Sequence, residues 1–248
     1  MAIELGKPAD YGQYILQRRF ALARSHALRA FEKRGAYLDV GCGNGAQTIL
    51  FAEHFDSWMG IDVEAARLDE FRKELERGNY AAAKLPREIL LYDGENIPCA
   101  TDSIDTLTCI EVIEHTRSDE HTAQELLRVL KPGGTAIITV PNKWWIFETH
   151  GAHLPWLPWN RVPFFSWLPK VIHSKYAKAR IYRKREIERL LTKAGFIIEE
   201  SFYVTAPMDM ISDPALQRIV REFFFGTDRT KIPFRATSVM LIATKAPR

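Results

Sequence analysis

A short apolar run that ends in three alternating glycines restricts the fold of this 248-residue chain more than any other feature. Residues Ala36–Val40 have the length and composition of a buried parallel strand, and Ala46–His54 carries apolar residues at helical spacing. Gly41, Gly43 and Gly45 therefore lie at a strand-to-helix turn. Glycine adopts backbone angles that other residues resist, and the following helix offers unpaired N–H groups to a ligand. The turn is a candidate cofactor cradle, although such a turn would also serve a purely structural purpose.

The spacing of the glycines narrows the class of cofactor. A dinucleotide fingerprint reads G-x-G-x-x-G, whereas this turn reads G-x-G-x-G with Asp39 two residues before the first glycine. Further along the chain, Asp62 ends a second apolar run, Trp58–Ile61. A carboxylate at the tip of a second strand can accept hydrogen bonds from both hydroxyls of a ribose. The pattern therefore indicates a nucleoside other than a typical dinucleotide.

Five segments together resemble the class I S-adenosylmethionine-dependent methyltransferases, and within them the type 11 group that includes the ubiquinone and menaquinone methyltransferases. They are Asp39–Gly45, Asp62, Asp93-Gly94, Ile110–His115 and Leu130–Gly134. The resemblance covers about residues 36–141, with a weaker match at Lys193–Phe196. It implies S-adenosyl-L-methionine as cofactor and S-adenosyl-L-homocysteine as product. It also implies an α/β, Rossmann-like fold: a seven-stranded, mostly parallel sheet with helices on both faces and an insertion after strand 5.

The resemblance further implies which residues bind the cofactor, at the carboxyl ends of the strands where open α/β sheets hold ligands. In the family, an acid at the position of Asp93 hydrogen-bonds the adenine amino group, and the next backbone N–H meets a ring nitrogen. An Asp-Gly pair is also an ordinary turn, so that alternative stays open. The implied cofactor-binding residues are Asp39, Gly41, Cys42, Gly43, Asn44, Gly45, Asp62, Val63, Asp93, Gly94, Ile110, Glu111 and Val112.

We expect a single methyltransferase domain in four parts. They are an N-terminal helical cover (1–35), a cofactor-binding half (36–141), a lid insertion (142–182) and a C-terminal sheet half (183–248). A helix is expected over Asp10–Lys33, either covering one sheet face or closing over the cofactor, so that Tyr11, Tyr14 or Arg18 reaches the cofactor carboxylate. Further helices are expected over 64–78, 118–130 and 185–194, and further strands over 88–92, 102–110, 135–140, 196–204 and 238–244.

The insertion is both aromatic and basic. It holds five of the six tryptophans, and its prolines exclude a regular helix between Pro141 and Lys170. No acidic residue occurs between Thr149 and Arg185, whereas eight basic residues do. One interpretation is an insertion packed onto the core, with solvated lysines. The other is a lid over an acceptor with an apolar body and an anionic part, such as an amphiphile or a membrane surface. Single-stranded nucleic acid is the weaker candidate, because the net charge is only +3.

The sulfonium of the implied cofactor already makes its methyl carbon electrophilic, so the main tasks of the protein are to position the acceptor and exclude water. A base is needed only for a proton-bearing acceptor. His115 and His150 are candidates, each with a structural role as the alternative. Candidate substrate contacts are Tyr14, Asn142, Trp144, Trp145 and His153. The run Glu148–His150 with His153 forms no complete, firmly spaced ligand set, so no metal is expected.

The function expected is methyl transfer to oxygen or carbon of a small-molecule or lipid-like acceptor. The alternatives are an NAD-type oxidoreductase, which the position of Gly45 disfavours, and a non-catalytic lipid- or partner-binding module. Cys42, Cys99 and Cys109 form no CxxC pair, which favours a reducing compartment. The N-terminus lacks a secretory pattern, and no apolar run reaches the roughly 18 residues of a membrane span. We therefore expect a cytoplasmic protein, with peripheral membrane contact left open.

Overall fold

The structure, a computed structural model, describes residues 10–152, 162–208, 211 and 213–247. Its centre is one eight-stranded sheet with the strand order β3-β2-β1-β4-β5-β8-β6-β7. The first five strands are parallel to one another, and β8, β6 and β7 continue the sheet in antiparallel fashion. The strands are β1 (Ala36–Val40), β2 (Ser57–Asp62), β3 (Arg87–Leu91), β4 (Ile104–Ile110), β5 (Leu130–Pro141), β6 (Phe196–Thr205), β7 (Arg229–Thr230) and β8 (Ala236–Lys245).

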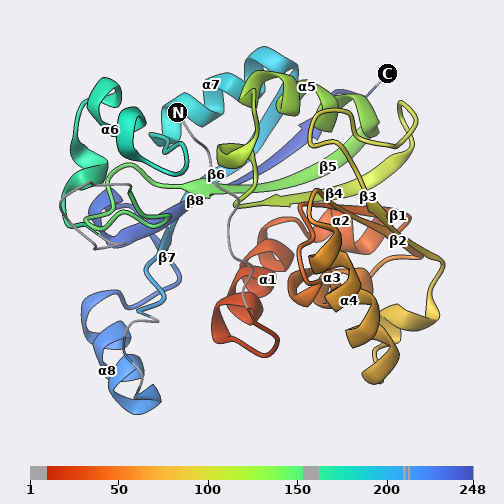
Figure 1. The fold of residues 1–248 in the computed structure, drawn as a ribbon, viewed down its shortest axis with the longest axis horizontal. Coiled ribbons are helices and arrows are strands. Elements are labelled where there is room, and N and C mark those ends of the chain that lie inside the picture. Colours follow the sequence, from red (N-terminus) through yellow and green to blue (C-terminus); the bar gives the residue numbers. More distant parts are fainter. Residues whose placement is uncertain (1–9, 153–161, 209–210, 212, 248) are drawn as a thin grey trace.

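Helices cover both faces of this sheet (Figure 1). On one face lie α5 (Asp119–Val129) and α7 (Lys184–Ala194). On the other lie α1 (Tyr14–His26), α2 (Leu28–Lys33), α3 (Ala46–Ala52) and α4 (Ala65–Arg77). Two further helices, α6 (Lys170–Tyr176) and α8 (Pro214–Phe224), lie at the side of the molecule where β7 is found. Short 3-10 turns occur at Ala81–Lys84, Ile113–His115, Phe165–Trp167 and Pro233–Arg235.

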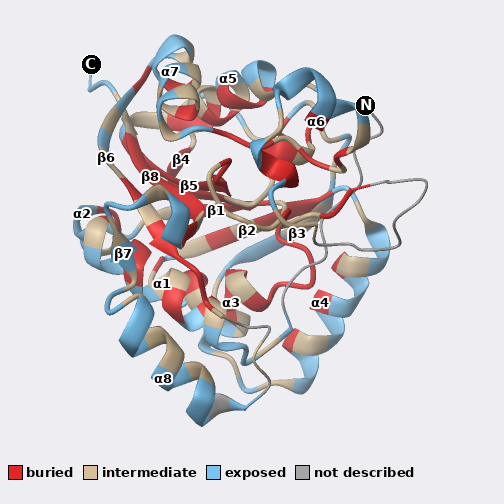
Figure 2. Cartoon of the chain, turned by 90° about the vertical axis from the view of Figure 1, so that its left-hand side faces the viewer, coloured by how far each residue is buried: buried red, intermediate tan, exposed pale blue. Residues whose placement is uncertain are grey.

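Strand alternation divides the core between the two faces. In β1, Tyr37 packs into the cluster under α3 and α4, whereas the next residue, Leu38, packs into the cluster under α5 and α7. All three of Tyr37, Leu38 and Val40 are almost fully buried, as a strand covered on both faces requires. Figure 2 shows this burial concentrated in the central strands.

Most of the expected elements are confirmed within one or two residues at their ends. Ser118 caps α5 by accepting a hydrogen bond from the His121 N–H, and Gly195 ends α7 in the left-handed conformation at φ 113°. Both features follow from local side-chain chemistry that is visible in the sequence. Among the described residues, no helix is both long and apolar enough to cross a bilayer.

Three expectations need correction. The single helix over 10–33 is two helices, because the chain leaves helical geometry at Ala27 (φ −118°, ψ 39°). The sheet has eight strands, since the two residues of β7 pair with Tyr203 and Val204 at the edge. The strand expected over 135–140 begins earlier, because β5 already includes Lys131–Gly134, and this early part pairs irregularly with β4 near Ile104.

Candidate active site

A cavity of about 660 Å³ opens at the carboxyl ends of β1, β2 and β4. Its volume lies within the range of roughly 300–1,000 Å³ that is typical of small-molecule sites. Every expected cofactor-binding residue borders it except Gly45, and both candidate bases, His115 and His150, border it as well. The sheet topology therefore brings together four segments that are far apart in the sequence, as the strand-end argument predicted.

Glycine is required at this turn by the packing of neighbouring side chains, as well as by the approach of a ligand to the backbone. Gly41 and Gly45 have φ values of +74° and +83°, where residues with a side chain are strained. A Cβ atom on Gly41 would lie 2.3 Å from Cγ2 of Val112, and one on Gly45 would lie 2.0 Å from Cδ2 of Phe71. The absence of a side chain at Gly45 thus lets the ring of Phe71, on α4, pack against the turn. Gly45 does not border the cavity, because it faces α4.

Two buried carboxylates hold this turn in place. Asp62 accepts a hydrogen bond from the N–H of Gly43 at 2.8 Å and another from the N–H of Glu64 at 3.0 Å. Asp39 accepts hydrogen bonds from the hydroxyls of Thr48 (2.6 Å) and Thr108 (2.7 Å). Burial raises the pKa of Asp39 to about 6, against the lowering effect of the two hydroxyls. Asp39 therefore joins β1 to α3 and β4, while Asp62 keeps acceptor capacity at the cavity wall.

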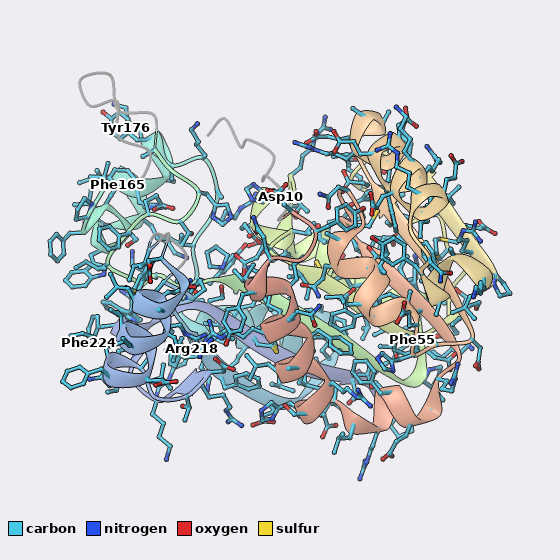
Figure 3. The ribbon with its side chains drawn as sticks, turned by 90° about the horizontal axis from the view of Figure 1, so that it is seen from below. Asp10, Phe55, Phe165, Tyr176, Arg218 and Phe224 are labelled. Atoms are coloured by element: carbon cyan, nitrogen blue, oxygen red, sulfur yellow. The ribbon has the colours of Figure 1, made fainter. Side chains whose placement is uncertain are left out.

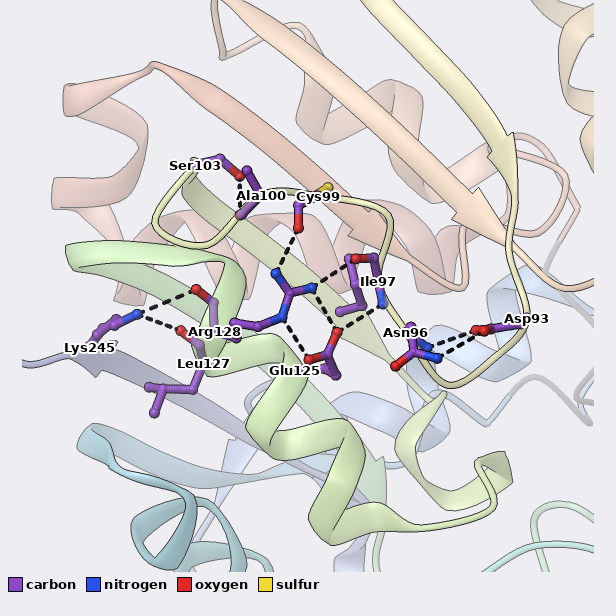
Figure 4. A network of polar contacts seen from close by, with 10 residues as sticks. All are labelled: Asp93, Asn96, Ile97, Cys99, Ala100, Ser103, Glu125, Leu127, Arg128 and Lys245. Carbon is purple, nitrogen blue, oxygen red and sulfur yellow. Dashed lines mark hydrogen bonds and ion pairs between the residues drawn. The ribbon is translucent and has the colours of Figure 1, made fainter.

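The loop after β3 is pinned from two directions (Figure 4). Asp93 is exposed, and its carboxylate accepts hydrogen bonds from the N–H groups of Glu95 (2.8 Å) and Asn96 (2.7 Å), which lower its pKa. Arg128 on α5 donates to the carbonyls of Ile97 and Cys99 at 2.8 and 2.7 Å. The Asp93 side chain thus stabilises its own turn at the cavity edge, and its contact with an adenine stays a prediction.

A polar cluster lies where the end of β4 meets the insertion. The rings of His115 and His150 meet edge to face with centroids 4.7 Å apart. Nε2 of His150 lies 3.6 Å from Oε1 of Glu114, and Nε2 of His115 lies 3.9 Å from the same oxygen. Burial raises the pKa of Glu114 well above its ordinary value, and it lowers the pKa of His150. A neutral imidazole at His150 can accept a proton, so its candidacy as a base is retained.

Sequence reasoning named the wrong arginine of the N-terminal helix. Arg18 is buried and forms an ion pair with Asp228 at 2.5 Å, so it does not point into the cavity. Arg19 borders the cavity instead, with Nη2 3.9 Å from Oε1 of Glu111. Adjacent helical residues differ by about 100° in direction, and the apolar stripe was too broken to decide which arginine faces inward. Tyr11, also considered, donates its hydroxyl hydrogen bond to the carbonyl of Asn44.

The four candidate substrate contacts that the structure describes do not border this cavity. Tyr14 is exposed beside Arg221, and Asn142 is buried, donating to the carbonyls of Pro233 and Ala236 at 2.8 Å. Trp144 packs against Phe234 and Trp145 against Phe147, while His153 lies outside the described residues.

The insertion nevertheless reaches the cavity through other residues. Thr149, His150, Gly151 and Lys178 border it, so part of the insertion forms a wall of the site. Within the insertion, Glu148 is fully buried and hydrogen-bonded to His173 of α6 at 2.7 Å. Sequence reasoning missed Thr149, Gly151 and Lys178, because no local pattern tells which residues of an irregular segment face inward.

The cavity wall has the groups that S-adenosylmethionine requires. Asp62 supplies a carboxylate for ribose hydroxyls, and the Arg19 guanidinium suits the carboxylate of the methionine part. Apolar side chains at Val63, Ile110 and Val112 provide surface for the adenine ring. These residues fit the cofactor that the sequence resemblance implies.

Comparison with known proteins decides the family. Residues 38–138 match the family model described as "Methyltransferase domain". Residues 38–138 form a class I S-adenosylmethionine-dependent methyltransferase domain. The remaining strands and helices complete the Rossmann-like fold of this class.

Relatives of this methyltransferase domain are distant. A protein from Mycolicibacterium smegmatis named "Probable S-adenosylmethionine-dependent methyltransferase" is 26% identical over 168 residues, which are 67% of this chain and 54% of that protein. A ubiquinone biosynthesis O-methyltransferase from Coxiella burnetii is 27% identical over 165 residues, covering 64% and 62% of the two chains. The chain thus spans about half to three-fifths of the length of these curated relatives.

A solved structure shows the same fold over nearly the whole chain. The S-adenosylmethionine-dependent methyltransferase from Mesorhizobium loti superposes with a TM-score of 0.57 at 18% identity. The superposition covers 90% of this chain and 98% of that one. At this identity the likeness shows the fold alone, and it confirms the α/β architecture expected from the sequence.

Proposed function

We propose that this protein transfers the methyl group of S-adenosylmethionine to an oxygen or carbon atom of a small amphiphilic acceptor. The observation that carries the proposal is the shared cavity: the cofactor rim of β1, β2 and β4 and the insertion residues 149–151 line one space. A cofactor held on the rim would therefore present its methyl group beside the insertion. The distant ubiquinone O-methyltransferases favour an acceptor with an apolar body and a reactive oxygen.

Bound S-adenosylmethionine supplies an electrophilic methyl carbon. The residues of this chain bind, orient and exclude water. Asp62 would hold the ribose, Arg19 would pair with the methionine carboxylate, and Thr149–Gly151 would close the space over the acceptor. For a hydroxyl acceptor, the imidazole of His150 or His115 would take the proton as the new bond forms.

An exposed apolar surface supports an amphiphilic acceptor delivered from a membrane. On α6, Val171 is 84% exposed, and on α8, Phe223 is 81% exposed. Figure 1 places both helices at the same side of the molecule, and Figure 3 shows the exposed Phe224 on that side. Lys170 and Lys175 on α6, with Arg218 on α8, add positive charge. Exposed aromatic residues beside basic ones suit an interface with anionic headgroups.

The experiment is a transfer assay with S-adenosylmethionine labelled in its methyl group. Purified protein is incubated with extracted lipids, quinone-pathway phenols and water-soluble phenols in parallel. Label in an amphiphilic product, absent from a Asp62→Ala control, supports the proposal. Label only in water-soluble acceptors would contradict the amphiphilic part, and hydride transfer with NAD in place of methyl transfer would contradict the whole.

A further inference from the structure

The cluster at the end of β4 contains a carboxyl group that the proposed methyl transfer does not use. Glu114 is completely buried, in the short turn Ile113–His115 that follows β4. Neither of its carboxylate oxygens accepts a hydrogen bond from the described residues. The backbone of Glu114 is held separately, because its carbonyl accepts from the N–H of Arg180 at 3.2 Å. The backbone position of Glu114 is therefore fixed, and both of its carboxylate oxygens lack a hydrogen-bond donor among the described residues.

A second acid, Glu111, lies close enough to Glu114 and His150 to act on both electrostatically. No described residue donates a hydrogen bond to the buried Oε1 of Glu111, and the Nη2 atom of Arg19, at 3.9 Å, is too far to supply one. Glu111 is held at a φ of +56°, a strained value for a residue with a side chain. Buried carboxylates without partners are costly, and they are retained where a cation or a proton compensates them.

Two imidazoles complete the set. Glu114, His115 and His150 each offer one ligand atom, and these atoms all lie within 4.8 Å of one another. Ligand atoms about 2.0–2.2 Å from a shared zinc ion lie up to roughly 4 Å apart, so small rotations of the two rings would bring them into its coordination sphere. Three of the four residues, Glu111, His115 and His150, border the cavity.

We propose that Glu114, His115 and His150, with Glu111 as a fourth ligand, bind a divalent transition-metal ion at the wall of the cavity. Imidazole nitrogen mixed with carboxylate oxygen suits zinc, iron(II), cobalt(II) or manganese(II), whereas calcium and magnesium prefer oxygen alone. The ion would neutralise the buried acids. With the ion bound, the metal would replace His115 and His150 as the group that promotes loss of the proton from a hydroxyl acceptor, because a metal-bound imidazole nitrogen cannot accept one. The ion would also join the insertion, through His150, to the end of β4, and would face the space where an acceptor oxygen binds.

The sequence did not indicate this set. Sequence reasoning examined His150 with its neighbours Glu148 and His153, and found no complete ligand set. In the structure Glu148 is already paired with His173, and His150 approaches Glu114, which is 36 positions away in the chain. The site depends on the packing of the insertion against the turn after β4.

The test uses the full chain, freed of metal by a chelator and without S-adenosylmethionine. Co²⁺ is titrated by its visible absorption and Zn²⁺ by calorimetry. We expect one equivalent of either ion, with affinity lowered at least about tenfold in Glu114→Gln and in His150→Ala, since even outer-shell changes cost about that much. The matched controls Glu120→Gln and His121→Ala, both exposed on α5, should bind as the unchanged protein does.

Absence of a stoichiometric ion in the unchanged protein would overturn the proposal, and so would equal affinity in the two cluster variants. If a variant fails to fold, the unchanged protein is loaded with Cu²⁺ and its electron paramagnetic resonance spectrum is measured. Coupling to two imidazole nitrogens supports the site, and its absence overturns it. Because no cofactor or acceptor is present, the result stands apart from the success or failure of the proposed methyl transfer.

Discussion

The carboxylate of Asp62, at the end of β2, accepts a hydrogen bond from the backbone N–H of Gly43 at 2.8 Å. One side chain thus holds the glycine turn that follows the neighbouring strand and also borders the cavity. The cofactor rim is built by contacts between strands, and a change at Asp62 affects both the turn and the ligand.

We predict that Asp62→Asn lowers the affinity for S-adenosylmethionine by at least about tenfold and the free energy of unfolding by about 1–3 kcal/mol. The carboxylate now accepts hydrogen bonds from two backbone N–H groups, one at each oxygen. In the Asn variant the amide nitrogen cannot accept a hydrogen bond, so one of the two is lost. Calorimetry and urea denaturation measure the two effects. Asp69→Asn, exposed on α4, is the control, and a variant of Asp62 that binds as tightly as the unchanged protein would refute the assignment.

Gly45→Ala should destabilise the fold more than Gly133→Ala does. Both glycines have positive φ, so both substitutions carry backbone strain of about 1–2 kcal/mol. Only at Gly45 does the new Cβ overlap a neighbour, the ring of Phe71, and this overlap adds about 1–3 kcal/mol. Thermal or urea unfolding of the pair isolates the overlap, and equal losses at the two positions would show that the Phe71 contact does not matter.

Asp39 makes stability depend on pH. Burial raises its pKa to about 6 in the folded chain, so the stabilising protonated form is lost as the pH rises from about 4 through 6. At about 1.4 kcal/mol per pKa unit, the loss is roughly 3 kcal/mol. Asp39→Asn does not titrate, so its stability relative to the unchanged protein should increase by about that amount between pH 4 and 7. A difference that stays constant across this window would contradict the assigned shift.

The insertion should loosen when its internal hydrogen bond is removed. Glu148 and His173 are both buried and are 2.7 Å apart, so Glu148→Ala leaves a buried imidazole without this partner, at a cost of about 1–3 kcal/mol. Limited proteolysis should cleave within residues 142–182 faster than in the unchanged protein. Lys175→Ala, exposed on α6, provides the comparison, and equal cleavage rates in all three proteins would mean that the pair does not hold the insertion.

Replacing exposed apolar residues should weaken membrane binding. Phe223→Ser and Val171→Ser each remove one exposed apolar side chain from the side that carries α6 and α8, so cosedimentation with anionic vesicles should decrease in each. Ile197→Ser removes an exposed apolar residue from β6 and should have no effect. If the three variants sediment alike, the surface does not bind membranes.

The parts of this structure that local chemistry determines were predictable from the sequence. The strands β1 and β2, the glycine turn, the serine cap of α5 and the glycine end of α7 each depend on residues within one short segment. Because strand ends in a parallel sheet meet at one rim, the convergence of Asp39, Asp62 and Ile110 followed from the same information.

The predictions that the structure corrected depend on contacts between segments that are far apart in the sequence. The choice between Arg18 and Arg19 is decided by Asp228, which is 210 positions away from Arg18. The edge strand β7 exists only because β6 offers unpaired backbone groups, and its two residues carry no periodic signal. The approach of His150 to Glu114 depends on how an irregular, aromatic insertion packs. A single sequence carries little information about such pairings.

The most direct test of the central claim is calorimetric titration of the intact protein with S-adenosylmethionine and S-adenosylhomocysteine. The account predicts one site for each compound, with both affinities reduced in Asp62→Ala and neither reduced in the exposed control Asp69→Asn. A folded protein that binds neither compound, or binds NAD in their place, would contradict the assignment of this cavity to methyl transfer.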